Sequence, residues 1–114
     1  MIDNAWLDGF SGAITVSDKN GKIIFMNSGA KKTFQTSDTK DWIGKNLFDC
    51  HPETAQKKLR EIMDNKSTNV YTIEKKGKKK IIWQAPWFEK DNEFAGLIEF
   101  SLEIPFEMPH FVRK

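Results

Sequence analysis

The sequence predicts an α+β domain, and three patterns along its 114 residues lead to that prediction. Two β-rich runs flank a polar turn in residues 12–27. Residues 54–65 have the apolar spacing of a helix with one buried face. Three further β-rich runs occupy residues 69–103. A chain of this length forms one domain with one core, so these strands and helices have to pack together.

Residues 5–10 predict one turn of helix at the N-terminus. Trp6, Leu7 and Phe10 share one side of it at three- and four-residue spacing. The spacing shows an apolar face without showing what covers that face. A lid over one edge of the core is one interpretation.

The runs 13–16 and 22–26 are predicted to be the strands of a hairpin, because they are rich in Ile, Val, Thr and Phe. Asp18 and Gly21 suit the turn between them, since Asp opens Asx turns and Gly tolerates positive φ. Asn27 then ends the second strand. Its side-chain amide is expected to cap a short helix over 28–35.

A polar link leads to an apolar cluster of large side chains, and core packing is the simplest interpretation of each. The cluster consists of Trp42, Ile43, Leu47 and Phe48. Cys50 and His51 follow and are the candidates for a cofactor or redox role. Two neighbouring side chains fall short of the four ligands of a structural zinc site, and no motif supplies a base or an oxyanion site for a nucleophile. A buried thiol is therefore favoured over mild redox reactivity.

Residues 54–65 are predicted to form the longest helix. Its buried stripe is Ala55, Leu59, Ile62 and Met63, at i, i+4, i+7 and i+8. Met63 is expected to pack in the core, although a flexible thioether also suits the wall of a cavity that has to adapt.

Three predicted strands follow, over 69–74, 79–88 and 94–103. In the last, Ile98 and Phe100 alternate with Glu99, so the charged set is predicted to face solvent. Pro86 cannot donate a ladder hydrogen bond and predicts a bulge or an edge stretch. The five lysines of 75–80 suit contact with phosphate or an acidic partner, but without interleaved aromatics a solvated turn is favoured.

Charge and composition exclude several classes of function. A net charge of +2 from 18 basic and 16 acidic residues provides no field for nucleic acid or a membrane. One cysteine rules out an internal disulfide framework and indicates a cytoplasmic protein. No signal peptide or run of membrane length is found, and no constellation of residues indicates an enzyme.

The order of these elements resembles the PAS family. The pieces that match are V-S-D-K-N-G-K-I-I-F-M-N at 16–27, I-G-K-N-L-F at 43–48, the helix from about Thr54 and F-A-G-L-I-E-F at 94–100. The resemblance implies a five-stranded antiparallel sheet in the order 2-1-5-4-3 with short helices on one face. Another small α+β sheet is the alternative. It also implies one free-standing, bacterial-type domain, with a cap segment 1–11, a core 12–104 and a tail 105–114.

The resemblance implies a signal-sensing module that binds a small molecule in an internal cavity, mediates protein interaction, or does both. A haem- or flavin-dependent sensor is the alternative. Flavin photochemistry is disfavoured because Leu47 stands where light-sensing members carry their cysteine, and the helix 54–65 lacks the axial histidine of haem-binding members. No cofactor, metal or catalytic residue is predicted.

The residues expected to line the cavity follow from the family's inward-facing positions. They are Phe34, Phe48, Met63, Tyr71, Trp83 and Phe100. Tyr71 and Trp83 are the expected polar contacts, because each has a hydrogen-bonding group on a large apolar body. In the middle strand Trp83 and Ala85 are placed toward the cavity and Ile82 toward the outer face.

The remaining apolar residues predict a homodimer, because the helices cover only the opposite sheet face. The expected interface residues are Trp6, Leu7, Phe10, Ile82, Phe106, Met108 and Phe111. Pro105 and Pro109 work against a helix in the tail, which is expected to be extended. The competing account is that the tail folds back onto its own sheet. A signalling protein is a further possible partner.

Overall fold

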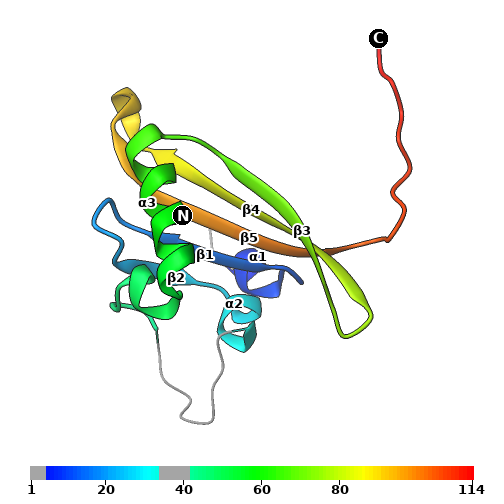
Figure 1. Cartoon of the computed structure of the whole chain (residues 1–114), viewed down its shortest axis with the longest axis horizontal. Helices are drawn as coiled ribbons and strands as arrows, with labels where there is room; N and C mark the ends of the chain where they lie inside the picture. Colours follow the sequence, from blue (N-terminus) through cyan, green and yellow to red (C-terminus); the bar gives the residue numbers. More distant parts are fainter. Residues whose placement is uncertain (1–4, 34–41) are drawn as a thin grey trace.

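A five-stranded antiparallel sheet in the order β2-β1-β5-β4-β3 organises the domain (Figure 1). The computed structural model describes residues 5–33 and 42–114, with Cys50 described by its backbone alone. The strands are β1 (Ala13–Ser17), β2 (Ile23–Met26), β3 (Asn69–Lys75), β4 (Lys78–Phe88) and β5 (Phe94–Ile104). The predicted strands and their order are confirmed, including an irregularity in β4, where the register shifts between Trp87 and Phe88.

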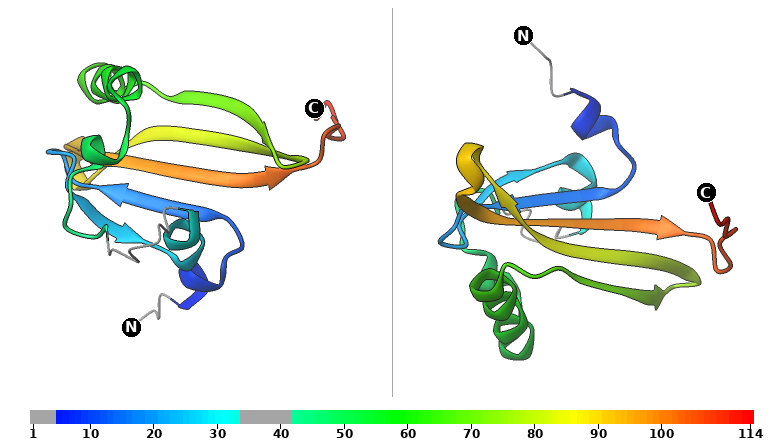
Figure 2. Two further views of the ribbon diagram at one scale, coloured as in Figure 1. Left: turned by 60° about the horizontal axis from the view of Figure 1, so that its bottom comes forward. Right: turned by 90° about the horizontal axis from the view of Figure 1, so that it is seen from above.

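Helices lie on both sides of this sheet. They are α1 (Ala5–Gly9), α2 (Ser28–Thr33), α3 (Glu53–Asn65) and the 3-10 turns η1 (Leu47–Cys50) and η2 (Lys90–Asn92). Figure 2 shows α1 and α3 on opposite sides of the sheet. We call the face covered by α3 the inner face and the other the outer face.

The core fills the space between the inner face and the helices. Its buried members are Ile23, Met26, Ala30, Leu47, Leu59, Ile62, Met63 and Leu97. Three of them come from α3, which confirms the buried stripe, and they pack where Leu97 of β5 points inward. Burying each such side chain contributes about 1.5–3 kcal/mol, so this contact fixes α3 on the sheet.

Asn27 ties α1, β1 and α2 together at one fully buried point. Its Oδ1 accepts hydrogen bonds from the backbone N–H of Ala30 and of Ile14, both at 2.9 Å. Its Nδ2 donates to the carbonyl oxygens of Leu7 and Gly12, also at 2.9 Å. The predicted helix cap is confirmed, and the same side chain also fixes the entry of β1.

Asn46 plays a similar but more exposed part at η1. Its Oδ1 accepts from the backbone N–H of Phe48 at 2.9 Å, and its Nδ2 donates to the carbonyl oxygen of Asn20 at 3.2 Å. It therefore joins η1 to the β1–β2 turn.

Gly96 marks the closest approach of β5 to the end of β1. Its φ is +154°, and a Cβ built there would run into the carbonyl oxygen of Ser17. That oxygen also accepts a 2.9 Å hydrogen bond from Trp87 Nε1, and Ser17 Oγ accepts one from the backbone N–H of Leu97 at 3.2 Å. Only glycine leaves room for this junction.

The strand registers correct three of the predicted positions. Gln84 and Glu99 are opposite each other and line a cavity together with Leu59, so they point to the inner face. Side chains alternate along a strand, so Trp83 and Phe100, which pair with each other, point to the outer face. The same alternation puts Ile82 inside, where it is buried. Trp83 and Phe100 were predicted inward and Ile82 outward, and all three predictions are wrong.

The wrong register has a physical cause. The run 81–83 is apolar throughout and therefore fits either face, so its orientation was predicted from the family resemblance. The fifth strand was oriented by assuming that Glu99 faces solvent. Gln84 instead donates a hydrogen bond to Glu99, which lets the carboxylate lie at the inner face.

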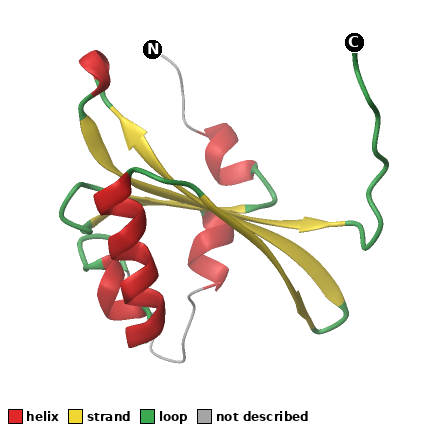
Figure 3. Ribbon diagram, turned by 45° about the horizontal axis from the view of Figure 1, so that its top comes forward, coloured by secondary structure: helices red, strands yellow, loops and turns green. Residues whose placement is uncertain are grey.

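Two parts of the chain project beyond the helices. The β3–β4 hairpin extends past α3, and the tail leaves the end of β5 as an extended segment (Figures 1 and 3). Val70, Tyr71, Ile73 and Trp83 of the hairpin are all exposed. The tail does not fold back over the sheet, and its Phe111 is 68% exposed.

Candidate functional site

A row of polar side chains crosses the inner face of β3, β4 and β5. Asn69 Nδ2 donates to Gln84 Oε1 at 2.9 Å, and Gln84 Nε2 donates to Glu99 Oε2 at 2.7 Å. Gln84 is only 6% exposed, so both ends of its amide are satisfied inside the protein. We call these three residues the polar row. It fixes the orientation of the Gln84 amide and of the Glu99 carboxylate.

The polar row borders a small internal cavity of about 10 Å³. The lining residues are Thr15, Ser17, Leu47, Leu59, Gln84, Leu97, Ile98 and Glu99. This is about the volume needed for one water probe, so a larger molecule fits only if the surrounding side chains move. Leu47 and Leu59 line it from the helices, and Thr15, Gln84 and Glu99 bring hydrogen-bonding groups from the sheet. Small-molecule sites combine apolar walls with a few polar groups in this way.

Tyr71 lies on the same face, on β3. Burial raises the pKa of its hydroxyl above the ordinary value of 10.0, and the negative charge of Glu99 raises it further. Both causes favour the neutral phenol in the folded state. Tyr71 therefore offers a neutral hydrogen-bonding group beside the carboxylate, as predicted for its face, although its ring is half exposed.

Because Tyr71 is the only tyrosine, its titration can be followed directly by tyrosinate absorbance. We expect the folded protein to titrate above 10.0 and Glu99→Gln to lower the pKa while leaving it above that value, because burial persists. The raised pKa of Tyr71 contributes to the free energy of unfolding. This contribution is complete below the pKa of the tyrosine in the unfolded chain, and it is lost as the pH rises through the pKa in the folded protein. A pKa at or below 10.0 in the folded protein would contradict the placement of Tyr71.

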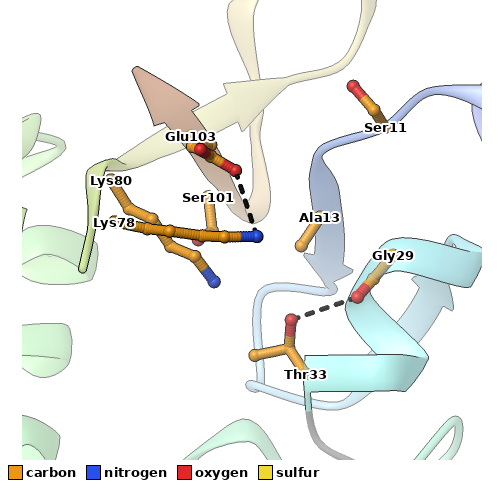
Figure 4. Close-up of a pocket in the computed structure, with 8 residues that line it drawn as sticks. All are labelled: Ser11, Ala13, Gly29, Thr33, Lys78, Lys80, Ser101 and Glu103. Carbon is orange, nitrogen blue, oxygen red and sulfur yellow. Dashed lines mark hydrogen bonds and ion pairs between the residues drawn. The ribbon is translucent and has the colours of Figure 1, made fainter. Parts of the chain in front are cut away.

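A second, more open pocket lies on the inner face between α2 and the far ends of β4 and β5 (Figure 4). Its volume is about 180 Å³. Its lining residues are Ser11, Ala13, Gly29, Thr33, Lys78, Lys80, Ser101 and Glu103. The strand alternation brings two lysines of the run 75–80 into it, whereas the sequence favoured a solvated turn for that run.

Phe48 and Met63 lie elsewhere. They line a surface groove of about 310 Å³, together with Phe94 and the end of α3. The Arg60 guanidinium lies 4.6 Å from the centre of the Phe48 ring, which covers that ring from outside. Both residues also contact the core, but neither lines the cavity beside the polar row.

His51 ends η1 and has a local structural role. Its Nδ1 lies 2.9 Å from the carbonyl oxygen of Leu47, and its own carbonyl oxygen accepts from Gln56 Nε2 at 2.9 Å. The side chain of Cys50 and the whole of Phe34 lie outside the described residues, so their predicted roles stay predictions. Within residues 5–33 and 42–114, no three His, Cys, Asp or Glu side chains form a group able to hold a metal ion.

Of the five predicted cavity residues that the structure describes, all but Phe34, it therefore puts only Tyr71 on the inner face near the polar row. Sequence reasoning missed Asn69, Gln84 and Glu99, which carry the hydrogen bonds. A signal for Glu99 was present, because polar and apolar residues alternate along β5. That alternation was interpreted as marking the solvent side.

The five-stranded antiparallel sheet in the order β2-β1-β5-β4-β3, with α3 over its inner face and α1 on the other side, defines the class as an α+β domain. Residues 11–98 match the family model described as PAS domain, so the chain belongs to the PAS family. The predicted family and fold are confirmed. No curated protein matches the chain. In the described ranges no helix has both the length and the apolar character to span a membrane.

Three solved structures with the same fold are distant in sequence. A C-terminal domain from Streptococcus mutans is 19% identical with a TM-score of 0.70, covering 88% of this chain and 81% of that one. A sensory box sensor histidine kinase from Vibrio cholerae is 17% identical with a TM-score of 0.63, covering 90% of both chains. VqmA bound to DPO is 16% identical with a TM-score of 0.64, covering 88% of this chain and 56% of that one. These similarities establish the fold.

Proposed function

We propose that this PAS domain senses a small polar molecule held against the inner face of its sheet. The polar row is the observation that supports the proposal. Its groups present an amide and a carboxylate in fixed positions beside Leu47 and Leu59 of the helices, and such preorganised groups give a pocket its specificity. The ligand would enter by displacing side chains around a cavity that is otherwise about the size of one water molecule.

The structural relatives are consistent with this function. One is described as a sensor histidine kinase and another as bound to DPO, so the fold serves both in signalling proteins and in a ligand-bound protein. A protein partner that receives the signal, and a cytoplasmic location suited to the single cysteine, complete the proposal.

Native mass spectrometry of the purified protein tests the proposal. We expect a bound small molecule that Glu99→Gln releases or weakens about tenfold or more, because a hydrogen bond to a charged group is worth about 1.5–3 kcal/mol. Glu93→Gln, at an exposed position directly before β5, is the matched control and should leave binding unchanged. If both variants lose the bound molecule, or if neither does, the assignment of Glu99 to the ligand site is contradicted. A haem or flavin absorption band would establish the alternative, a cofactor-dependent sensor.

We also propose that the outer face forms a homodimer. Trp83 is 45% exposed there, beside Phe100, and Trp6 of α1 is 65% exposed. Phe106, Met108 and Phe111 of the tail are exposed as well, and the proposal includes them in the interface. An apolar surface of this extent is typical of an interaction site. Ile82, which was expected in this interface, is replaced by Trp83.

Light scattering over a range of concentrations tests the dimer. We expect Trp83→Glu to weaken it by about 30-fold or more, since a buried interface tryptophan contributes about 2 kcal/mol or more. Ile73→Glu introduces the same charge on the opposite face of the same hairpin and should leave the dimer intact. A wild-type protein that stays monomeric would rule the dimer out. A chain ending at Ile104 that remains fully dimeric would remove the tail from the interface.

A further inference from the structure

The pocket between α2 and the ends of β4 and β5 has an unusual lining for a sheet face that packs against helices. Lys78 and Lys80 are two residues apart on β4, so both side chains point to the inner face. Figure 4 shows them extending side by side into the pocket, with their ammonium groups between Ser101 and Glu103 of β5 and Thr33 of α2. Lys79, between them in the sequence, points to the outer side and donates to the carbonyl oxygen of Phe106 at 3.3 Å.

The charges in this pocket do not balance. Lys78 Nζ lies 3.6 Å from Glu103 Oε1, in an ion pair with both side chains more than half exposed. Within the part of the chain that the structure describes, Lys80 makes neither an ion pair nor a hydrogen bond through its ammonium group, although it is partly buried. The pocket therefore has two ammonium groups and one carboxylate, and that carboxylate pairs with Lys78 alone. Like charges held close together favour a bound anion, which reduces their repulsion.

The remaining polar groups suit an anion as well. Thr33 Oγ1 donates to the carbonyl oxygen of Gly29 at 3.1 Å and stays at the pocket wall, while the hydroxyls of Ser11 and Ser101 make no hydrogen bond within the described residues. Serine hydroxyls and ammonium groups are donors for carboxylate or phosphate oxygens. A volume of about 180 Å³ is large enough for such a group with a short attached chain.

From this geometry we propose that the pocket binds the carboxylate or phosphate group of a small molecule, with Lys80 as its main charge partner. The proposal rests on the sensory function proposed above and adds the class of ligand. The anionic group binds beside α2, and the rest of the ligand extends along the inner face toward the polar row.

Titration of ¹⁵N-labelled protein with inorganic phosphate and, separately, with succinate tests the proposal, with chloride at matched ionic strength as the reference. We expect saturable shifts of the Lys80, Ser101 and Thr33 amides with at least one of the two anions. Which anion acts identifies the ligand group. Lys80→Gln should weaken binding by about tenfold or more, because it removes a charge-assisted hydrogen bond.

Lys79→Gln is the matched control, since it removes the same charge one residue away on the other side of the sheet. It should leave the affinity unchanged, and Lys80→Arg should preserve it. If Lys80→Gln and Lys79→Gln weaken anion binding equally, or if chloride shifts the same amides as much, the effect is general charge screening. Either result would overturn the proposal. Shifts of Gln84 and Glu99 caused by a co-purified molecule, with no response to phosphate or succinate, would overturn the anionic class and leave the sensory function standing.

Discussion

Replacing Asn27 with alanine should lower the free energy of unfolding by about 3–5 kcal/mol, the largest loss expected from any side-chain truncation in this domain. The change leaves two backbone N–H groups and two carbonyl oxygens without their partner at a buried point. Each unsatisfied buried group costs about 1–3 kcal/mol, although water entering the space recovers part of that. The total free energy of unfolding of a domain of this size is only about 5–15 kcal/mol, so the midpoint of urea unfolding should move to a markedly lower concentration.

Asn46→Ala is the matched control for this measurement. It removes the same amide from a cap with one accepted and one donated hydrogen bond near the surface, so we expect a loss of about 1 kcal/mol. Similar losses for the two variants would show that Asn27 is no more than an ordinary helix cap.

Gly96→Ala should lower the free energy of unfolding almost as much, by on the order of 3–4 kcal/mol. The new Cβ would meet the Ser17 carbonyl oxygen and lie 2.8 Å from the carbonyl carbon of Asp18. Both are backbone atoms, so no flexible side chain can move aside. β1 and β5 would have to separate, which also strains the hydrogen bond from Trp87 Nε1 to Ser17.

Gly77→Ala separates the steric cost at Gly96 from the general cost of positive φ. Gly77 has φ +77° in the β3–β4 turn, and nothing lies within 4 Å of a Cβ built there. The Gly77→Ala variant should lose only about 1 kcal/mol of its free energy of unfolding, because the left-handed conformation is its only cost. Equal midpoints for the two alanine variants in urea would mean that β1 and β5 are less tightly joined than the structure indicates.

Most of the fold could be predicted because its signals are local. The hairpin turn at Asp18, the cap at Asn27 and the stripe on α3 each depend on residues only a few positions apart. The four-way role of Asn27 was less accessible, because its partners Leu7 and Gly12 are distant in sequence.

The candidate site was predicted less well, because it depends on register between strands. Alternation divides β5 into two sets of residues but does not say which set faces the helices. The polar set was assumed to be outside, and the hydrogen bond that allows Glu99 to lie inside comes from Gln84 on the neighbouring strand. Pairing across strands is not visible in the local pattern. Trp83 and Phe100 were therefore predicted to line the cavity, although they lie on the outer face.

The projecting β3–β4 hairpin has a consequence for how the domain moves. Few buried apolar contacts hold its far end, whereas α3 packs over the other end of the sheet. The outer strand β3 can therefore detach from β4 at a small cost in free energy while the rest of the sheet stays folded, and its amides exchange with solvent before those of β1. Because Tyr71 and Asn69 lie on this strand, such fraying opens one wall of the inner face to an incoming molecule.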